Sequence, residues 1–419
     1  MVIGRIVIAG TSSGAGKTTV ASGLIAALAR RGNAPAPFKV GPDFIDPSYH
    51  ALAAGRPGRN LDAFLSGPEL IAPLFRHGAA GADIAVIEGV MGLYDGASGR
   101  GELASTAHIA KLLQAPVVLV VDAAAMARSV AAIVHGYRTF DPGVHVAAVI
   151  LNRVGSPAHA QLLRDALDLP VLGAIPRDDS LKVPERHLGL VPATERAIEH
   201  LAAAIAEHCD LEALVALAHT APELPGPAWS PGGEPSDVRI AIARGPAFSF
   251  HYEENLELLR ANATLVEFDP LHDRLPPADA LVLAGGFPET FGEPLSANAP
   301  LRADIAAFRG PILAECGGLL YLARELDGRP MCGVLDATAT MTRRLKLGYR
   351  EVIAQADHPV WPAGTTVRGH EFHYSTLEPG GHAWERTGGH VRGLVHASFL
   401  HTHWAATPEV AQRLVAACA

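Results

Sequence analysis

The chain has 419 residues, 49% of them hydrophobic, so it is long enough to form two domains with separate cores. Its formal net charge is −9, and it has neither a basic block suited to nucleic acid nor a polybasic or amphipathic stretch suited to a membrane surface. None of the four cysteines belongs to a C-x-x-C pair, which favours a reduced, cytoplasmic protein without a disulfide framework.

Short runs of β-branched and apolar residues recur in the first half, separated by longer Ala- and Leu-rich segments. The first run, residues 5–10, follows an N-terminus that lacks the apolar core of a signal peptide. The most apolar run, residues 116–121, is far too short to span a membrane. Residues 18–32 carry apolar positions at helical spacing and end at Gly32. This alternation predicts an α/β fold with a parallel sheet covered by helices on both faces.

A glycine-rich loop, GTSSGAGKTT, joins the first predicted strand to the first predicted helix. It resembles the phosphate-binding pattern G-x-x-x-x-G-K-[ST], although Thr11 stands at the first glycine position. Glycines let backbone N–H groups turn toward phosphate oxygens, and a lysine adds a mobile positive charge. A glycine-rich turn without a function is the alternative. The residues expected to bind ATP are Ser13, Gly14, Ala15, Gly16, Lys17, Thr18 and Thr19.

Carboxylates follow two of the other predicted strands. Glu88 ends the strand in DIAVIEG, and Asp43 and Asp46 follow the strand in APFKV. Ligands of open α/β sheets collect at such carboxyl ends, and a nucleotide-bound Mg²⁺ requires hard oxygen ligands. We therefore expect Mg²⁺ near the phosphate loop, with the hydroxyl of Thr18 as a further ligand. Each carboxylate taken alone could equally be a loop cap or a solvated charge.

The segment 222–236 contains five prolines and three glycines, a composition that suits neither a helix nor a central strand. We interpret it as a linker between an ATP-dependent synthetase domain, residues 1–221, and a second α/β domain, residues 237–419. The second domain again alternates strands and helices, beginning with a strand at residue 238.

A cysteine follows the predicted strand PILAE and precedes a helix. Gly317 and Gly318 permit a sharp turn after Cys316, as in a nucleophile elbow, and the helix N-terminus favours the thiolate. Cys316 is therefore the predicted nucleophile, whereas a small buried hydrophobe is the alternative for a lone cysteine. The other three cysteines lack this context.

Acyl transfer at a cysteine requires oxyanion donors and a base. Backbone N–H groups of Gly317 and of Gly286 and Phe287, at the end of another strand, are the candidate donors. In SFLHTHW, His401 is the candidate base and His403, two residues later, is a candidate partner. A metal-binding pair and an inert surface pair are the alternatives for these two histidines, and no third metal ligand is evident.

The ordered motifs resemble the cobyrinic acid and hydrogenobyrinic acid a,c-diamide synthase family along nearly the whole chain. The first half carries GTSSGAGKTT, KVGPDFIDPSYH, IEGVMGLYDG, ILNRVGS and PERHLGL, and resembles a dethiobiotin-synthetase-like ATPase. The second half carries LAGGFPE, AECGGLLYL, GHEFHYS and SFLHTHW, and resembles a class I glutamine amidotransferase domain.

The resemblance implies amidation of the a and c carboxylates of a corrin ring, with ATP, L-glutamine and a corrin polycarboxylate as substrates. It implies that Cys316 releases ammonia from glutamine and that ATP activates the carboxylate as an acyl phosphate. It further implies that Asn152 contacts adenine. By the same family pattern, Asp43 and Glu88 would hold Mg²⁺, and Asp46 and Asp95 would lie by the substrate.

Class I amidotransferases carry an H-x-E pair, and His403 occupies the position of the acid in this sequence. Either His403 orients His401, or Cys316 and His401 act as a dyad. A negatively charged chain that binds a polycarboxylate needs a local basic pocket, for which Lys182, Arg186 and His187 are the candidates.

Four alternatives in function remain open from the sequence. Hydrogenobyrinic acid is the favoured substrate, but cobyrinic acid, nickel sirohydrochlorin and the later cobyric acid amidations are alternatives. A partner-binding ATPase switch is a more distant one, because the extra lysine of those loops would fall at Ser12. A monomer and a homodimer are both compatible with the sequence.

Overall fold

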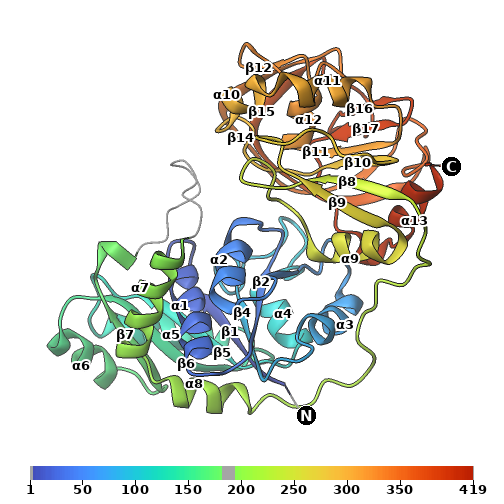
Figure 1. Ribbon diagram of the computed structural model, residues 1–419. Helices are drawn as coiled ribbons and strands as arrows, with labels where there is room; N and C mark the ends of the chain where they lie inside the picture. Colours follow the sequence, from blue (N-terminus) through green and yellow to red (C-terminus); the bar gives the residue numbers. More distant parts are fainter. Residues whose placement is uncertain (1–2, 182–193, 419) are drawn as a thin grey trace. The chain divides into compact units, whose positions relative to one another are not determined.

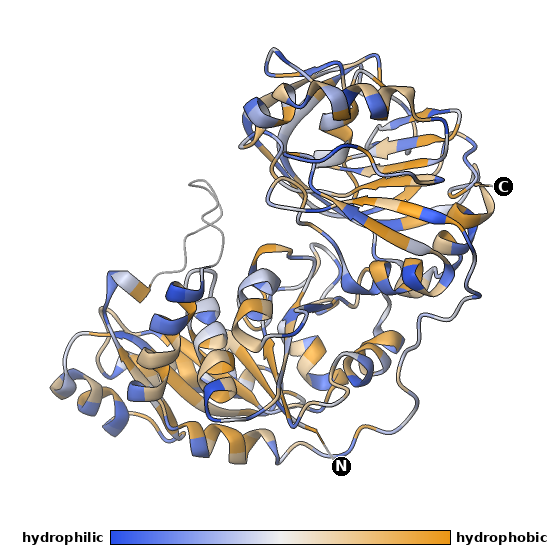
Figure 2. Cartoon of the chain, in the orientation of Figure 1, coloured by the Kyte–Doolittle hydropathy of each residue, from blue (hydrophilic) through white to orange (hydrophobic). Residues whose placement is uncertain are grey.

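A computed structural model describes residues 3–181 and 194–418 of the chain. The chain forms two compact units, residues 1–230 and 231–419 (Figure 1). The division falls within the segment that we expected to be a linker. In both units, strands of the parallel sheet are among the most hydrophobic segments (Figure 2). No helix of the described residues is long and apolar enough to cross a membrane.

The first unit is built on a seven-stranded parallel sheet, as the alternation of strands and helices predicted. The central strand is buried at every position, which explains its apolar run from Ile6 to Ala9. In spatial order the strands are β3 (Arg59–Leu61), β2 (Pro35–Val40), β4 (Ile84–Glu88), β1 (Gly4–Gly10), β5 (Val117–Asp122), β6 (Val146–Val154) and β7 (Val171–Pro176).

Helices connect these strands, and α1, α2 and α7 pack side by side (Figure 1). Several of the helices begin at a side-chain cap: the oxygens of Ser105, Ser156, Thr194 and Asp210 each accept from a backbone N–H three residues later. The helices are α1 (Lys17–Arg30), α2 (Ile45–Ala54), α3 (Pro68–Gly78), α4 (Thr106–Leu112), α5 (Ser129–Phe140), α6 (Pro157–Asp165), α7 (Glu195–His208) and α8 (Leu211–Ala218), with a 3₁₀ turn η1 (Asp179–Leu181).

The proline-rich segment after α8 is held on the first unit. The guanidinium of Arg76 donates to the carbonyls of Leu224, Pro225 and Pro227 at 2.6–3.4 Å. The backbone N–H of Trp229 donates to Pro73 at 2.9 Å, and its ring meets that of His77 edge-on at 5.0 Å. Because prolines keep this segment out of helices and sheets, its carbonyls need donors from elsewhere. The guanidinium of Arg76 supplies them.

The second unit contains a six-stranded sheet, parallel except for β16, which pairs antiparallel with β17. In spatial order its strands are β16 (His390–Arg392), β17 (Val395–Ser398), β11 (Ile312–Glu315), β10 (Ala280–Leu283), β8 (Arg239–Ala243) and β9 (Thr264–Phe268). Its helices are α9 (Glu253–Asn262), α10 (Gly292–Ala297), α11 (Ala299–Ala307), α12 (Gly317–Leu322) and α13 (Glu409–Ala416), with a 3₁₀ turn η2 (Trp404–Ala406).

A second, four-stranded sheet stands beside it, and the sequence did not predict it. It is dominated by a long antiparallel pair with a register shift between Met341 and Lys346. The shift interrupts the two-residue alternation of side chains that would mark a strand. Much of the first strand of this pair, residues 338–353, is exposed, so its polar sequence resembles a loop. The strands are β13 (Arg329–Pro330), β12 (Glu325–Leu326), β14 (Thr338–Ile353) and β15 (Thr366–Glu378).

Candidate active sites

The phosphate loop runs from Thr11 to Gly16, between β1 and α1, as the sequence predicted. Gly16 precedes α1 with φ 98°, in the left-handed region that favours glycine. A Cβ at this position would lie 2.0 Å from Nδ2 of Asn152, so the close approach also requires glycine. Asn152, in β6, donates from the same Nδ2 to the carbonyl of Ala15 at 2.9 Å. The predicted adenine contact therefore stands directly beneath the loop.

Lys17 lies across its own loop, with Nζ donating to the carbonyl of Ser12 at 2.9 Å. Burial, and then the neighbouring charge of Lys39, lower its pKa to about 8. The hydroxyl of Thr18 faces the predicted Mg²⁺ site, whereas that of Thr19 donates to the carbonyl of Leu181 at 3.0 Å. Lys17 and Thr18 are therefore placed to serve the phosphates, and the side chain of Thr19 is engaged elsewhere.

Glu88, at the end of β4, is the centre of a buried charge cluster. Its Oε1 accepts from Thr18 Oγ1 at 2.7 Å and from Lys39 Nζ at 2.9 Å, and its Oε2 lies 2.7 Å from His50 Nε2. The same Lys39 ammonium lies 2.6 Å from Oδ2 of Asp46. We call these five side chains the β4 charge cluster.

Opposite charges in the cluster offset the free-energy cost of burying each other. Burial raises the pKa of Glu88, but Lys39 and His50 more than offset it and hold that pKa well below its usual range. Burial also raises the pKa of Asp46, and Lys39 only partly opposes the effect. The pKa of Lys39 itself is raised, because Asp46 and Glu88 outweigh the cost of its burial.

The remaining predicted carboxylates of this unit lie in turns. Oδ1 of Asp43 accepts from the N–H of Ile45 at 2.9 Å, so this carboxylate caps its own turn at the start of α2. Oδ2 of Asp95 accepts from the N–H of Gly92 at 2.9 Å. The structure thus joins Glu88 and Asp46 through Lys39.

Mg²⁺ prefers hard oxygen donors and usually keeps substrate phosphates and waters among its ligands. Within residues 3–181 and 194–418, no group of three or more His, Cys, Asp or Glu side chains is arranged to hold a metal ion. Thr18 Oγ1 and Glu88 Oε1 nevertheless lie 2.7 Å apart beside the phosphate loop. This donor set fits a magnesium ion that arrives with a nucleotide. The three residues of the predicted basic pocket, Lys182, Arg186 and His187, lie outside the described residues.

In the second unit, Cys316 forms a strained elbow between β11 and α12. Its φ of 47° and ψ of −99° are unusual for a residue with a side chain, and such strain is often found at nucleophiles. Its N–H donates to the carbonyl of Ser398 at 2.7 Å, and its Sγ lies 3.9 Å from the carbonyl oxygen of Phe372 in β15. The backbone therefore fixes the thiol between β17 and β15.

Two of the three predicted oxyanion donors lie beside this elbow. Gly317 begins α12, so its N–H has no carbonyl partner within the helix. The backbone nitrogen of Gly286 is near it, since a Cβ on Gly317 would lie 3.0 Å from that nitrogen. The third prediction requires correction: the N–H of Phe287 donates to the carbonyl of Ala247 at 2.9 Å and is directed away from the thiol.

His401 follows β17, and its ring is buried against Gly285. Burial lowers its pKa, but interactions with Cys316 and then with Glu315 more than offset that effect and raise the pKa to about 10. Nδ1 of His401 lies 3.6 Å from Oε2 of Glu315. The structure therefore brings the predicted nucleophile and base together.

His403 does not contact His401 through its ring nitrogens, so its predicted role as the orienting partner requires correction. Its Nε2 lies 3.3 Å from Oε2 of Glu254 in α9, and its Nδ1 accepts from the N–H of Ala405 at 3.4 Å. Its ring packs against Tyr252, with the centroids 4.8 Å apart. The turn after His401 directs the two side chains to different surroundings.

Three residues that contact these sites were not predicted from the sequence: Lys39, His50 and Glu315. Lys39 lies in β2 directly opposite Glu88 in β4, and a lysine inside an apolar strand is a signal that could have identified it. Glu315 immediately precedes Cys316, but its approach to His401 depends on the pairing of β11 with β17.

The fold and the two sites define a nucleotide-binding unit followed by a glutamine amidotransferase unit. Comparison with known families agrees: residues 6–191 match the CobQ/CobB/MinD/ParA nucleotide binding domain, and residues 239–409 match the CobB/CobQ-like glutamine amidotransferase domain.

Individual relatives match over both units. The chain is 53% identical to a hydrogenobyrinate a,c-diamide synthase of Streptomyces coelicolor, over 99% of this chain and 97% of the relative. It is 51% identical to the enzyme of that name from Mycobacterium tuberculosis, over 99% and 98% of the two chains. A cobyrinate a,c-diamide synthase of Syntrophotalea carbinolica is 45% identical, over 99% and 98%. The chain belongs to the a,c-diamide synthase family of glutamine-dependent amide ligases.

Proposed function

We propose that this protein converts the a and c carboxylates of hydrogenobyrinic acid to amides, with ATP and glutamine as co-substrates. The observation that carries the proposal is the identity of 53% to a hydrogenobyrinate a,c-diamide synthase along 99% of the chain. Three relatives named cobyrinate a,c-diamide synthase are 42–45% identical, which favours the metal-free ring. The two sites described above supply the chemistry of such a reaction.

Glutamine hydrolysis is assigned to the second unit. The sulfur of Cys316 attacks the amide carbon, and the carbonyl electrons move to an oxygen that faces the N–H groups of Gly286 and Gly317. His401 gives a proton to the departing nitrogen, so ammonia leaves and a thioester remains. Water then attacks the thioester while His401 accepts its proton, and the sulfur of Cys316 leaves, which yields glutamate and frees the site for another turnover.

Carboxylate activation is assigned to the first unit. A carboxylate oxygen is a poor leaving group, and transfer of the γ-phosphoryl group of ATP converts it to a good one, which ammonia displaces as phosphate. Lys17 and the loop N–H groups hold the phosphates. Thr18 and Glu88 would hold Mg²⁺, which would neutralise phosphate charge.

Other residues would bind the corrin substrate. Asp46 and Asp95 are proposed to lie at the acceptor carboxylate and its acyl phosphate, as in the family pattern. Lys182, Arg186 and His187 are proposed to bind other carboxylates of the ring.

The test is mass spectrometry of the products formed from hydrogenobyrinic acid, cobyrinic acid and nickel sirohydrochlorin, each supplied with ATP and glutamine. We expect a diamide from hydrogenobyrinic acid at the highest kcat/KM. A higher kcat/KM on either metallated ring would reassign the substrate. ATP hydrolysis without glutaminase activity or any amide product would favour the ATPase switch instead.

A further inference from the structure

Two acidic side chains approach the two histidines of SFLHTHW, one each. Oε2 of Glu315 lies 3.6 Å from Nδ1 of His401, and Oε2 of Glu254 lies 3.3 Å from Nε2 of His403. In the H-x-E pattern a single acid two residues after the histidine would orient it. In this chain that position is a histidine with its own acidic partner, so the acid for His401 comes from another element.

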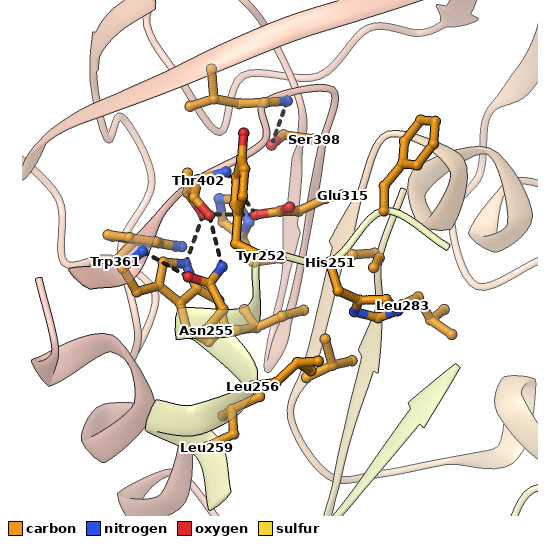
Figure 3. A pocket seen from close by; sticks show the side chains of 18 of the residues that line it. His251, Tyr252, Asn255, Leu256, Leu259, Leu283, Glu315, Trp361, Ser398 and Thr402 are labelled. Carbon is orange, nitrogen blue, oxygen red and sulfur yellow. Dashed lines mark hydrogen bonds between the residues drawn. The ribbon is translucent and has the colours of Figure 1, made fainter. Parts of the chain in front are cut away.

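The carboxylate of Glu315 is held by the residue between the two histidines. Its Oε1 accepts from the N–H of Thr402 at 3.1 Å and from the Thr402 hydroxyl at 2.7 Å. That hydroxyl also accepts from Nε1 of Trp404 at 2.8 Å. Asn255 donates from Nδ2 to the carbonyl of Thr402 at 2.8 Å (Figure 3). One carboxylate oxygen is therefore fixed by hydrogen bonds, which leaves the other directed to His401.

Glu315 also has space for water. Its side chain keeps 22% of its exposure, whereas that of His401 keeps 1%. It lines a cavity of about 40 Å³ together with Asn255, Ser398 and Thr402, among apolar walls (Figure 3). A cavity of this size admits water where polar groups can bind it. Water there can solvate the carboxylate.

We propose that Glu315 is the acidic positioning residue of His401, in place of the acid of the H-x-E pattern; this rests on the proposed glutaminase function of Cys316. Glu315 accepts a hydrogen bond from Nδ1–H, which fixes the tautomer and directs Nε2 toward the thiol and the departing nitrogen. The separation of 3.6 Å shortens when substrate binds, as catalytic hydrogen bonds commonly do.

The elements support this assignment. β11 pairs in parallel with β17, and Glu315 lies opposite Ser398, three residues before His401. The backbone of His401 is fixed by a reciprocal pair of hydrogen bonds with His370 in β15, both 2.9 Å. The backbone of His401 and one carboxylate oxygen of Glu315 are both held by hydrogen bonds. The distance between Nδ1 of His401 and Oε2 of Glu315 therefore depends on few side-chain torsions.

The experiment compares Glu315→Gln with Glu254→Gln in the full-length protein, since each removes one charge beside one histidine. Glutaminase kcat and KM for glutamine are measured across pH. We expect Glu315→Gln to lower kcat about 10²- to 10³-fold with little change in KM, somewhat less than the roughly 10⁴-fold loss caused by changing a triad aspartate. The alkaline limb of its kcat profile shifts to lower pH, because the imidazolium loses a charged partner. Glu254→Gln leaves that limb in place.

The proposal would be overturned if Glu315→Gln kept the wild-type kcat and the wild-type alkaline limb. It would also be overturned if the alkaline limb shifted in Glu254→Gln and not in Glu315→Gln. Glu315→Asp withdraws the carboxylate by one methylene, so its alkaline limb should lie at a pH between those of the wild type and Glu315→Gln. This variant provides the test if Glu315→Gln does not fold. Ammonia-dependent amidation, expected to persist in all three variants, reports intact synthetase function. If the wild-type protein itself lacks glutaminase activity, the proposed function fails together with this role.

Discussion

The two sites of this protein are held in place by opposite means. In the first unit, the β4 charge cluster fixes Glu88 by contacts with a hydroxyl, an ammonium and an imidazole, all within 2.9 Å. In the second unit, the thiol of Cys316 has few polar contacts, and a strained backbone holds it. Buried charges need partners, whereas a nucleophile needs position and access.

The difference predicts how each site responds to change. Removing one charge from the β4 charge cluster leaves the others buried without full compensation, so folding and chemistry should be affected together. Removing the thiol takes away the proposed nucleophile and little else. The chemistry of the second unit should therefore be separable from that of the first, whereas the chemistry of the first unit should not be separable from its stability.

The largest expected effect comes from Cys316→Ala. Glutamine-dependent amidation should fall by about a thousandfold or more, because no other group replaces a covalent nucleophile. Amidation with ammonium chloride should persist and should rise with pH as free ammonia becomes more abundant. Product mass measured against pH with each nitrogen donor checks this. Near-native use of glutamine would make Cys316 structural, and loss of both donors in a folded, ATP-binding variant would contradict the separation.

The second comparison lies within the amidotransferase unit. His401→Ala should lower the glutaminase rate by about two to four orders of magnitude, the usual cost of losing the proton-transfer group. His403→Ala should lower the rate less, because its ring contacts Glu254 and Tyr252. Steady-state glutaminase rates of the two variants, with thermal midpoints as a control for folding, distinguish them. A greater loss of rate in His403→Ala at equal stability would reverse the assignment.

The third test breaks the β4 charge cluster. Glu88→Gln should lower ammonia-dependent amidation by about a hundredfold and weaken the response to Mg²⁺, because an anionic oxygen donor is lost. It should also destabilise the protein by about 3–5 kcal/mol, since Lys39 keeps its burial with one partner fewer. Glutaminase activity should remain in the folded fraction.

The carboxylate of Asp43 caps its own turn, and Asp43→Asn shows whether it also binds Mg²⁺. The matched control is Asp83→Asn, at a side chain that holds Ala34 and Asn33 near the surface. A Mg²⁺ titration and a denaturation curve for each variant give both readouts. An unchanged titration in Glu88→Gln would remove Glu88 from the metal site.

The smallest effect concerns protonation of Lys17, whose pKa is lowered to about 8 by burial and by Lys39. ATP favours the charged form, so binding must take up a proton once the pH exceeds that pKa. Affinity for ATP should therefore weaken as pH rises, approaching about tenfold per pH unit. Calorimetry in two buffers of different ionisation enthalpy measures the proton uptake. Lys17→Ala should bind weakly at every pH and should lose this dependence; the same slope in that variant would assign it to another group.

Much of the fold could be predicted because its strands are short, apolar and fully buried. The strands β1, β2, β4, β5 and β8 all lie where apolar runs occur in the sequence. The long pair of β14 and β15 could not be found in this way. Its exposed cationic residues and its register shift remove the periodicity on which such predictions depend.

The sites were predictable to the extent that a local motif defines them. Lys17 and Cys316 belong to turns whose glycines show their geometry in the sequence itself. The partners of these residues come from other strands, through register: Lys39 opposite Glu88, and Glu315 brought near His401. Spacing along the chain suggested His403 as the partner of His401, and only the three-dimensional turn shows that the two rings separate.

The anchoring of the proline-rich segment by Arg76 has a consequence for the tether between the units. Trp229 is fixed on the first unit, and Ser236 is fixed on the second, where its N–H donates to Asn262 at 3.2 Å. The connecting chain is then only residues 230–235, with a fully extended reach of roughly 20 Å. A linker this short gives each unit an effective concentration in about the millimolar range relative to the other. Two separate proteins in solution would not usually reach such a concentration.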